Sequence, residues 1–210
     1  MSTSPERLQR WLDGFAVRHG PVQRSFDDTT VRLLAEDGAT AEVQVPFPPL
    51  EGGLVEHALR TRRLGVLLAR LGGCACGVFD GPRLLASKVT TRQVHGRSAA
   101  GGQSQQRFAR RREGQVRVAT QAFADTAARV LLPEAGGLDA VVLGGERTTV
   151  DAVLADRRLA ALRPLVSGRL LDGPDPRQAV LLASYEQARA VWIRVTDPPG
   201  DAQAAGAPTF

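Results

Sequence analysis

The stretch LGVLLARLGGCACGVFDGPRLLASKV, residues 64–89, decides the fold of this protein. It contains three short apolar runs that are separated by Gly72-Gly73 and by Asp80-Gly81-Pro82, two combinations that favour turns. Tight turns of this length join antiparallel neighbours, because a parallel pair needs a much longer crossover. The stretch therefore predicts a three-stranded antiparallel meander.

Helix and strand patterns alternate after the meander. A helix is predicted from about residue 104 to about 130, and its apolar residues recur at steps of three and four. An apolar strand follows at 138–145, then a helix near 147–158, a strand near 169–171, a helix near 179–191 and a last strand at 192–195. The fold class predicted from this order is α/β, an α+β mixed sheet with helices on the sheet faces.

The first 50 residues predict a smaller unit. Residues 4–18 favour a helix with Ser4 as a cap, and Asp37-Gly38 favours a hairpin turn at 36–39. The proline-rich run at 46–50 cannot be helical, and we place a boundary there. The predicted organisation is an N-terminal helix-and-hairpin appendage at 1–50, a main domain at 51–197 and a disordered Pro/Gly/Ala-rich tail at 198–210.

Composition bounds the class of protein. The chain has 210 residues, of which 43% are hydrophobic and 23% charged, as in globular domains. Its longest apolar stretch, 64–79, is too interrupted to span a bilayer, and the N-terminus has no secretion-signal pattern. We expect a cytoplasmic protein without a membrane partner. The only cysteines, Cys74 and Cys76, offer two metal ligands at most, so neither a metal nor a cofactor is predicted.

Positive charge is concentrated in one segment. Between Lys88 and Arg117 the chain has eight basic residues and one acidic residue, a local excess of seven positive charges. The whole chain carries +5, so the remainder is negative by two. Four of these arginines lie at the start of the predicted long helix, where unpaired N–H groups already disfavour cations. A helix start with added guanidinium groups suits phosphate, and a run of this length suits the backbone of a nucleic acid. The residues assigned to backbone contact are Arg97, Arg107, Arg110, Arg111 and Arg112, with His95 beside them.

The loop before this helix is rich in glycine and glutamine, in the run SAAGGQSQQRFARRREGQ at 98–115. Glutamine does not titrate, so it cannot serve as a general acid or base. An amide can instead hold a water or a carbonyl group, which is sufficient where the bond to be broken is already activated. The ester of peptidyl-tRNA is such a bond.

This run resembles release-factor-like peptidyl-tRNA hydrolases of the VLRF type, in their actinobacterial branch. Gly101-Gly102-Gln103 matches the GGQ triplet of peptide-chain release factors, and the segment from Gly102 to Gln105 matches the GxxQ motif of their relatives. The resemblance implies a fold similar to the middle domain of archaeal and eukaryotic release factors, which is related to ribonuclease H. It implies as partners the large ribosomal subunit at its peptidyl-transferase centre, peptidyl-tRNA and rRNA.

The resemblance also implies a catalytic glutamine, with Gly101, Gly102 and Ser104 in the same motif. The GxxQ register points to Gln105 and the GGQ register to Gln103. We favour Gln105, and Gln103 stays open. The implied function is the release of nascent chains from stalled ribosomes, in rescue or quality control.

Two other functions are compatible with the same residues. A non-catalytic module that binds rRNA or tRNA would need only the arginines. An RNA endonuclease acting near the 3′ end of tRNA would need acids, but the acids considered, Asp80, Asp139 and Asp151, are scattered without a motif. The strand-to-helix turn at Gly144-Gly145 is interpreted as an ordinary capped turn and not as a phosphate site.

Overall fold

The computed structural model describes residues 1–92 and 103–198, with the backbone alone for residues 103–109. Contacts within the chain divide it into two compact units. The first unit combines Met1–Arg60 with Arg189–Phe210, and the second is Thr61–Ala188. The second unit is therefore inserted in the sequence of the first.

The first unit is an antiparallel sheet covered by helices. Its strands are β1 (Ser2–Thr3), β2 (Val22–Phe26), β3 (Thr30–Ala35), β4 (Thr40–Gln44) and β9 (Val191–Thr196), in the order β1-β9-β4-β3-β2. The helices are α1 (Pro5–His19) and α2 (Leu54–Leu59). In this sheet every neighbouring pair of strands runs antiparallel.

The spacing of apolar residues explains how α1 packs. Leu8, Leu12 and Phe15 fall on one side of the helix at steps of four and three, and all three are buried. They share a core with alternate residues of the strands, including Val43 and Ile193. The hairpin predicted at 36–39 joins β3 to β4, with Gly38 at a φ of 88°.

The second unit is built on the predicted meander. Strands β5 (Arg63–Arg70), β6 (Gly73–Asp80) and β7 (Arg83–Thr91) pair antiparallel, and β8 (Ala140–Gly145) pairs parallel with β5. The sheet order is β7-β6-β5-β8, so Leu67 of β5 lies between Cys76 of β6 and Leu143 of β8. The predicted mixed α/β sheet is confirmed.

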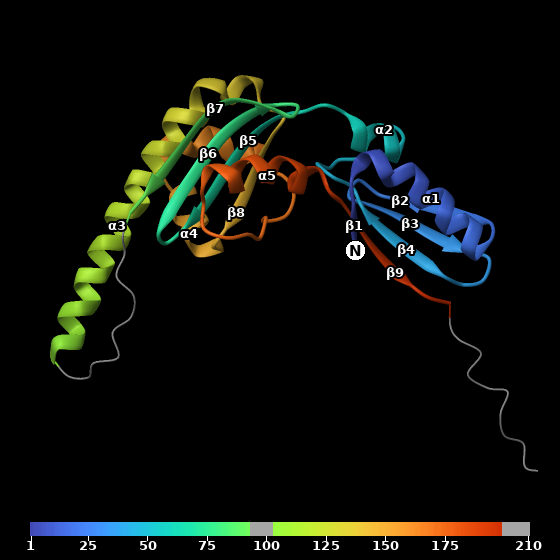
Figure 1. The fold of residues 1–210 in the computed structure, drawn as a ribbon, viewed down its shortest axis with the longest axis horizontal. Coiled ribbons are helices and arrows are strands. Elements are labelled where there is room, and N and C mark those ends of the chain that lie inside the picture. The colour runs from blue at the N-terminus through green and yellow to red at the C-terminus, as the bar shows by residue number, and fades with distance from the viewer. Residues whose placement is uncertain (93–102, 199–210) are drawn as a thin grey trace, which may run out of the picture. The chain divides into compact units, whose positions relative to one another are not determined.

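Helices cover both faces of this second sheet (Figure 1). The elements are α3 (Gln103–Leu131), α4 (Arg147–Leu154) and α5 (Gln178–Arg189), with short 3-10 helices η1 (Leu132–Gly137) and η2 (Arg157–Leu165). Phe123 of α3 packs on the face that carries Leu67 and Cys76. Phe79, at the other parity of β6, stacks on Tyr185 of α5 with ring centroids 5.5 Å apart. Among the described residues, no helix has the length and apolar character that crossing a bilayer requires.

The strand at the C-terminal end differs from the sequence expectation. Residues 191–196 were expected in the main domain, but β9 pairs with β4 and β1 in the first sheet, where Val191 and Ile193 complete the core. The structure also assigns α2 to the first unit and divides the chain at Arg60 and Arg189 instead of at residues 50 and 197. An apolar alternation predicts a strand but does not say which sheet it joins.

The segment after α4 also differs from expectation. The strand predicted near 169–171 is reduced to an isolated bridge between Gly144 and Leu171, and residues 157–165 form η2. A second isolated bridge, between Val141 and Val166, and backbone hydrogen bonds from Ser167 and Leu171 also hold this segment beside β8.

Candidate functional site

The long helix α3 has a supported half and a projecting half. Its fully buried side chains begin at Ala119 and include Phe123 and Ala127, which pack on β5, β6 and β7. Before Ala119 the described side chains are exposed or half-buried, and Val118 is 62% exposed. Figure 1 shows this part of α3, residues 103–118, continuing past the end of the sheet. We call it the projecting half of α3.

The projecting half carries a cluster of arginines. Arg110, Arg111 and Arg117 are exposed and Arg112 is half-buried. Arg110 and Arg117 are seven residues apart and share one side of the helix, whereas Arg111 and Arg112 are each rotated about 100° further around the axis. Glu113 is the only acidic residue between Gln103 and Ala124. The charge of this half is thus positive on more than one side.

Several arginines elsewhere in the described part of the chain pair with carboxylates, although others, such as Arg7 and Arg10 of α1, do not. Arg63 pairs with Glu134, and Arg189 with Glu6 at 2.7 Å. Within residues 1–92 and 103–198, no such pair is found for Arg110, Arg111, Arg112 or Arg117. A guanidinium without an acid in its own chain is available to an anion from outside.

The two units also differ in net charge. Thr61–Ala188 contains 19 basic and 11 acidic residues, a net charge of +8. Met1–Arg60 with Arg189–Phe210 contains 8 basic and 11 acidic residues, a net charge of −3. Nucleic acid is attracted by net positive charge, so the second unit is the half that suits it.

The predicted site residues fall into two groups. The backbone of Gln103, Ser104, Gln105 and Arg107 is described, and it forms the first two turns of α3. His95, Arg97, Gly101 and Gly102 lie outside the described residues, as do the side chains of residues 103–109. The helix therefore begins at the glutamines of both candidate motifs, and the arginine cluster follows within two turns.

The acids considered as metal ligands are not brought together. The carboxylate of Asp139 accepts a hydrogen bond of 2.6 Å from the backbone N–H of Arg63, and Asp151 lies 3.9 Å from Arg147 in the next turn of α4. Across the described part of the chain, no group of three or more His, Cys, Asp or Glu side chains has a metal-binding arrangement. Asp139 and Asp151 therefore each contact a nearby group of the chain, a backbone N–H and a guanidinium respectively.

Cys74 and Cys76 lie in the core of the second unit. Both are fully buried on the α3 face of β6, with their Sγ atoms 3.6 Å apart. The contact with Cys74, followed by burial, raises the pKa of Cys76 well above its ordinary value. A buried thiol with a raised pKa, such as that of Cys76, fills space and is a poor nucleophile.

The turn between β8 and α4 is shaped by glycine. Gly145 has a φ of 99°, and a Cβ placed there would lie 2.3 Å from the carbonyl oxygen of Ala69. The hydroxyl of Thr149 donates to the carboxylate of Glu146 at 2.7 Å. A carboxylate at this helix start repels phosphate, but Glu146, the N-cap residue, makes no side-chain capping hydrogen bond, so the cap predicted from the sequence is not formed.

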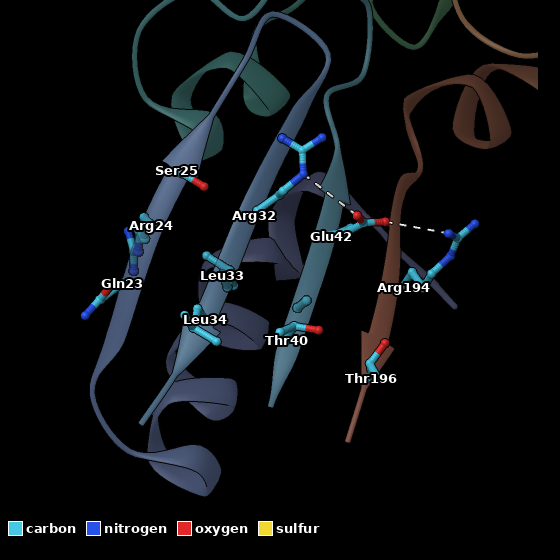
Figure 2. Close-up of a pocket in the computed structure, with 11 residues that line it drawn as sticks. Gln23, Arg24, Ser25, Arg32, Leu33, Leu34, Thr40, Glu42, Arg194 and Thr196 are labelled. Carbon is cyan, nitrogen blue, oxygen red and sulfur yellow. Dashed lines mark ion pairs between the residues drawn. The ribbon is translucent and has the colours of Figure 1, made fainter. Parts of the chain in front are cut away.

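The first unit has a hollow that the sequence did not reveal. About 520 Å³ of space lies over the face of the sheet that α1 leaves open, lined by side chains from β2, β3, β4 and β9 (Figure 2). Arg32 lies 3.0 Å from Asp27 and 3.8 Å from Glu42, and Glu42 lies 3.6 Å from Arg194. The lining contains three arginines, Arg24, Arg32 and Arg194, and one carboxylate, Glu42, so the hollow is net positive.

Comparisons with known proteins define the class of this one. Residues 62–194, more than half of the chain, match the family model described as the actinobacteria/chloroflexi VLRF1 release factor. The chain belongs to this VLRF1 release-factor family, and the resemblance inferred from the glutamine loop is confirmed. Membership of a release-factor family indicates a role in translation.

A solved structure is also similar. The crystal structure of the archaeal translation termination factor aRF1 matches with a TM-score of 0.46 and 17% sequence identity over 77% of this chain. The matched region spans 50% of the archaeal chain. A search of curated proteins returned no match.

Proposed function

We propose that this protein is a ribosome-associated peptidyl-tRNA hydrolase that releases nascent chains from stalled ribosomes, in rescue or quality control. Its substrate is the ester between peptide and tRNA at the peptidyl-transferase centre of the large subunit. A glutamine at the start of α3 orients the attacking water. This role places the protein in the cytoplasm.

One observation carries the proposal: a cationic half-helix projects from the sheet and begins at the candidate glutamines. A structural helix would be expected to pack along its length, whereas the described side chains of the first half are exposed or half-buried and none is fully buried. Its arginines suit the phosphates of rRNA or tRNA. Binding through Arg107, Arg110, Arg111 and Arg112 would bring the start of the helix to the RNA.

The proposed hydrolysis requires the protein mainly to position the attacking water. The ester is already activated, so an uncharged amide that holds water in line, together with electrostatic stabilisation, can accelerate hydrolysis. Gly101 and Gly102 leave room for close approach to the substrate. Arg97 and His95 are proposed as further contacts to the backbone.

The two candidate glutamines are separable by experiment. Positions two residues apart lie on nearly opposite sides of an α-helix, so Gln103 and Gln105 cannot serve the same geometry. We assign the catalytic role to Gln105, with Ser104 in the same motif.

The test uses purified ribosomes that carry a labelled peptidyl-tRNA. Gln105→Ala should abolish peptide release and leave co-sedimentation with ribosomes intact. Gln106→Ala, the neighbouring amide in the same run, is the matched control and should release peptide at the wild-type rate. Equal release by wild type and Gln105→Ala contradicts the assignment, and loss of release in Gln103→Ala alone transfers the role to Gln103.

The tRNA product separates the proposed activity from the other two functions. Hydrolysis leaves a full-length tRNA on a denaturing gel. A shortened tRNA would indicate an endonuclease, and co-sedimentation without release would indicate a binding module. Either of these results rejects the hydrolase.

A further inference from the structure

Within the supported half of α3, one turn, residues 123–126, is held from three directions. Phe123 is 1% exposed and faces the sheet. The hydroxyl of Thr126 lies 2.7 Å from the hydroxyl of Thr90 on β7, the edge strand of the sheet. The carboxylate of Asp125 accepts a hydrogen bond of 2.7 Å from the guanidinium of Arg158 on η2.

The contact with β7 is a directed chain of hydrogen bonds. Thr126 donates its hydroxyl proton to the carbonyl of Ala122 one turn earlier, at 2.9 Å. The same hydroxyl oxygen can then accept the proton of Thr90. Thr126 is 4% exposed, so this bond is shielded from competing water.

The guanidinium of Arg158, which contacts α3, is oriented by Asp156, a neighbour in its own segment. Asp156 accepts from the backbone N–H of Arg158 at 2.9 Å and from its guanidinium at 2.7 and 3.0 Å. These bonds lower the pKa of Asp156 to about 2, and the hydrogen bond from Arg158 lowers the pKa of Asp125. Both carboxylates therefore stay ionised, and the guanidinium is aimed at α3 without a search among rotamers.

This turn lies one turn behind Ala119, where the projecting half begins. The helix rises about 1.5 Å per residue, so the 16 steps from Ala119 back to Gln103 span about 24 Å. A tilt of about 5° at the supported end would then move the start of the helix by about 2 Å. Misplacement of about 1 Å at a reacting centre can cost about 100-fold in rate.

We propose that Asp125, Thr126 and Arg158 form a clamp that sets the direction of α3, and that they are positioning residues for the reaction at the helix start. The inference rests on the proposed function for its kinetic consequence only. The direction of the helix is a property of the free protein and can be measured without ribosomes.

The experiment measures the helix direction and the reaction separately. Spin labels at Glu113→Cys on the projecting half and Asp151→Cys on α4 report their separation by double electron–electron resonance. Arg158→Ala and Thr126→Val are each introduced into this doubly labelled protein. The controls are Arg157→Ala, which removes an exposed arginine one residue away, and Thr126→Ser, which keeps the hydroxyl. The native thiols, Cys74 and Cys76, are buried and shielded from the label.

The expected result is a broadened or shifted distance distribution in Arg158→Ala and Thr126→Val, with both controls as in the wild type. In proteins without labels, the release rate at saturating ribosome complex should fall about tenfold or more in the two clamp variants. The concentration needed for half-saturation should change little, because the arginines that bind RNA are untouched.

Three outcomes overturn the clamp: distances that match the wild type, release that stays at the wild-type rate despite altered distances, or an Arg157→Ala variant that behaves as Arg158→Ala does. If the wild-type protein releases no peptide, the proposed function fails. The distance distributions still decide whether the clamp directs α3.

Discussion

Arg117 and Ala119, two residues apart on α3, mark the place where the helix leaves the core. Arg117 is exposed to solvent, whereas Ala119 is 2% exposed and packs on the sheet. From Arg117 back toward the helix start, the described side chains contribute little to the core. Substitutions in this half should therefore change binding much more than folding.

Neutralising the arginines of the projecting half tests its role in RNA binding. Replacing Arg110, Arg111, Arg112 and Arg117 with glutamine should weaken binding to ribosomes and reduce the slope of log affinity against log salt by about three. The free energy of unfolding should change by less than about 0.5 kcal/mol per site, since these positions are exposed or half-buried. A salt titration of binding and a denaturant titration measure the two effects.

The matched control for this variant is on the first unit. Arg7, Arg10 and Arg18 are exposed arginines of α1, and their replacement with glutamine should leave the salt slope unchanged. A salt slope that is equal in the wild type and the α3 variant would remove the nucleic-acid role of the helix.

Asp27 makes the stability of the first unit depend on pH. Its carboxylate accepts hydrogen bonds from the hydroxyl and the backbone N–H of Thr29 and pairs with Arg32, and these contacts lower its pKa to about 2 from an ordinary 3.8. Between these two values the unfolded chain binds more protons than the folded one, so acid favours unfolding. The contribution of Asp27 is full above pH 4 and is lost as the pH falls toward 2.

The measurement is the urea midpoint at pH 6, 4 and 3, followed for wild type and Asp27→Asn. The variant should be less stable at pH 6, and the difference from the wild type should shrink at pH 3. Asp28→Asn, at the next position of the same turn, is the control. A difference that is constant over this range would show that Asp27 is not the titrating group.

Two glycines of the second unit should respond to alanine in opposite directions. Gly145→Ala places a Cβ 2.3 Å from a backbone oxygen at a φ of 99° and should destabilise the unit by about 2 kcal/mol or more. Gly114→Ala, in the projecting half of α3, meets no described atom within 4 Å and should stabilise the helix by about 0.5–1 kcal/mol. Thermal unfolding followed by circular dichroism measures both, and a Gly145→Ala variant as stable as the wild type would contradict the tight turn between β8 and α4.

Local patterns were sufficient for much of the fold. The meander was predictable because each turn has its own glycine or proline, and α3 because its apolar residues recur at helical steps up to Val130. The strand β2 was missed because VQRSF has little apolar alternation, as suits an edge strand with an exposed face. The partner of β9 was not predictable, because pairing between distant segments leaves no trace in the local pattern.

The positive charge of the candidate site was predictable from the sequence, but the contacts that hold α3 in place were not. A block of arginines at a helix start is visible in the sequence, and it led to the family that the comparisons show. The contacts of Asp125, Thr126 and Arg158 join segments 33 and 36 residues apart, and each residue by itself is an ordinary polar side chain. Only the folded arrangement shows that they meet at one turn.

The insertion of one unit into the other bears on how this chain is made. During vectorial synthesis the first four strands of the N-terminal sheet leave the exit tunnel long before β9, which belongs between β1 and β4. Until then β1 has no neighbour to pair with, and the edge of β4 is open. The inserted unit has all of its strands together in the sequence, so its sheet can form before β9 is available to complete the sheet of the first unit.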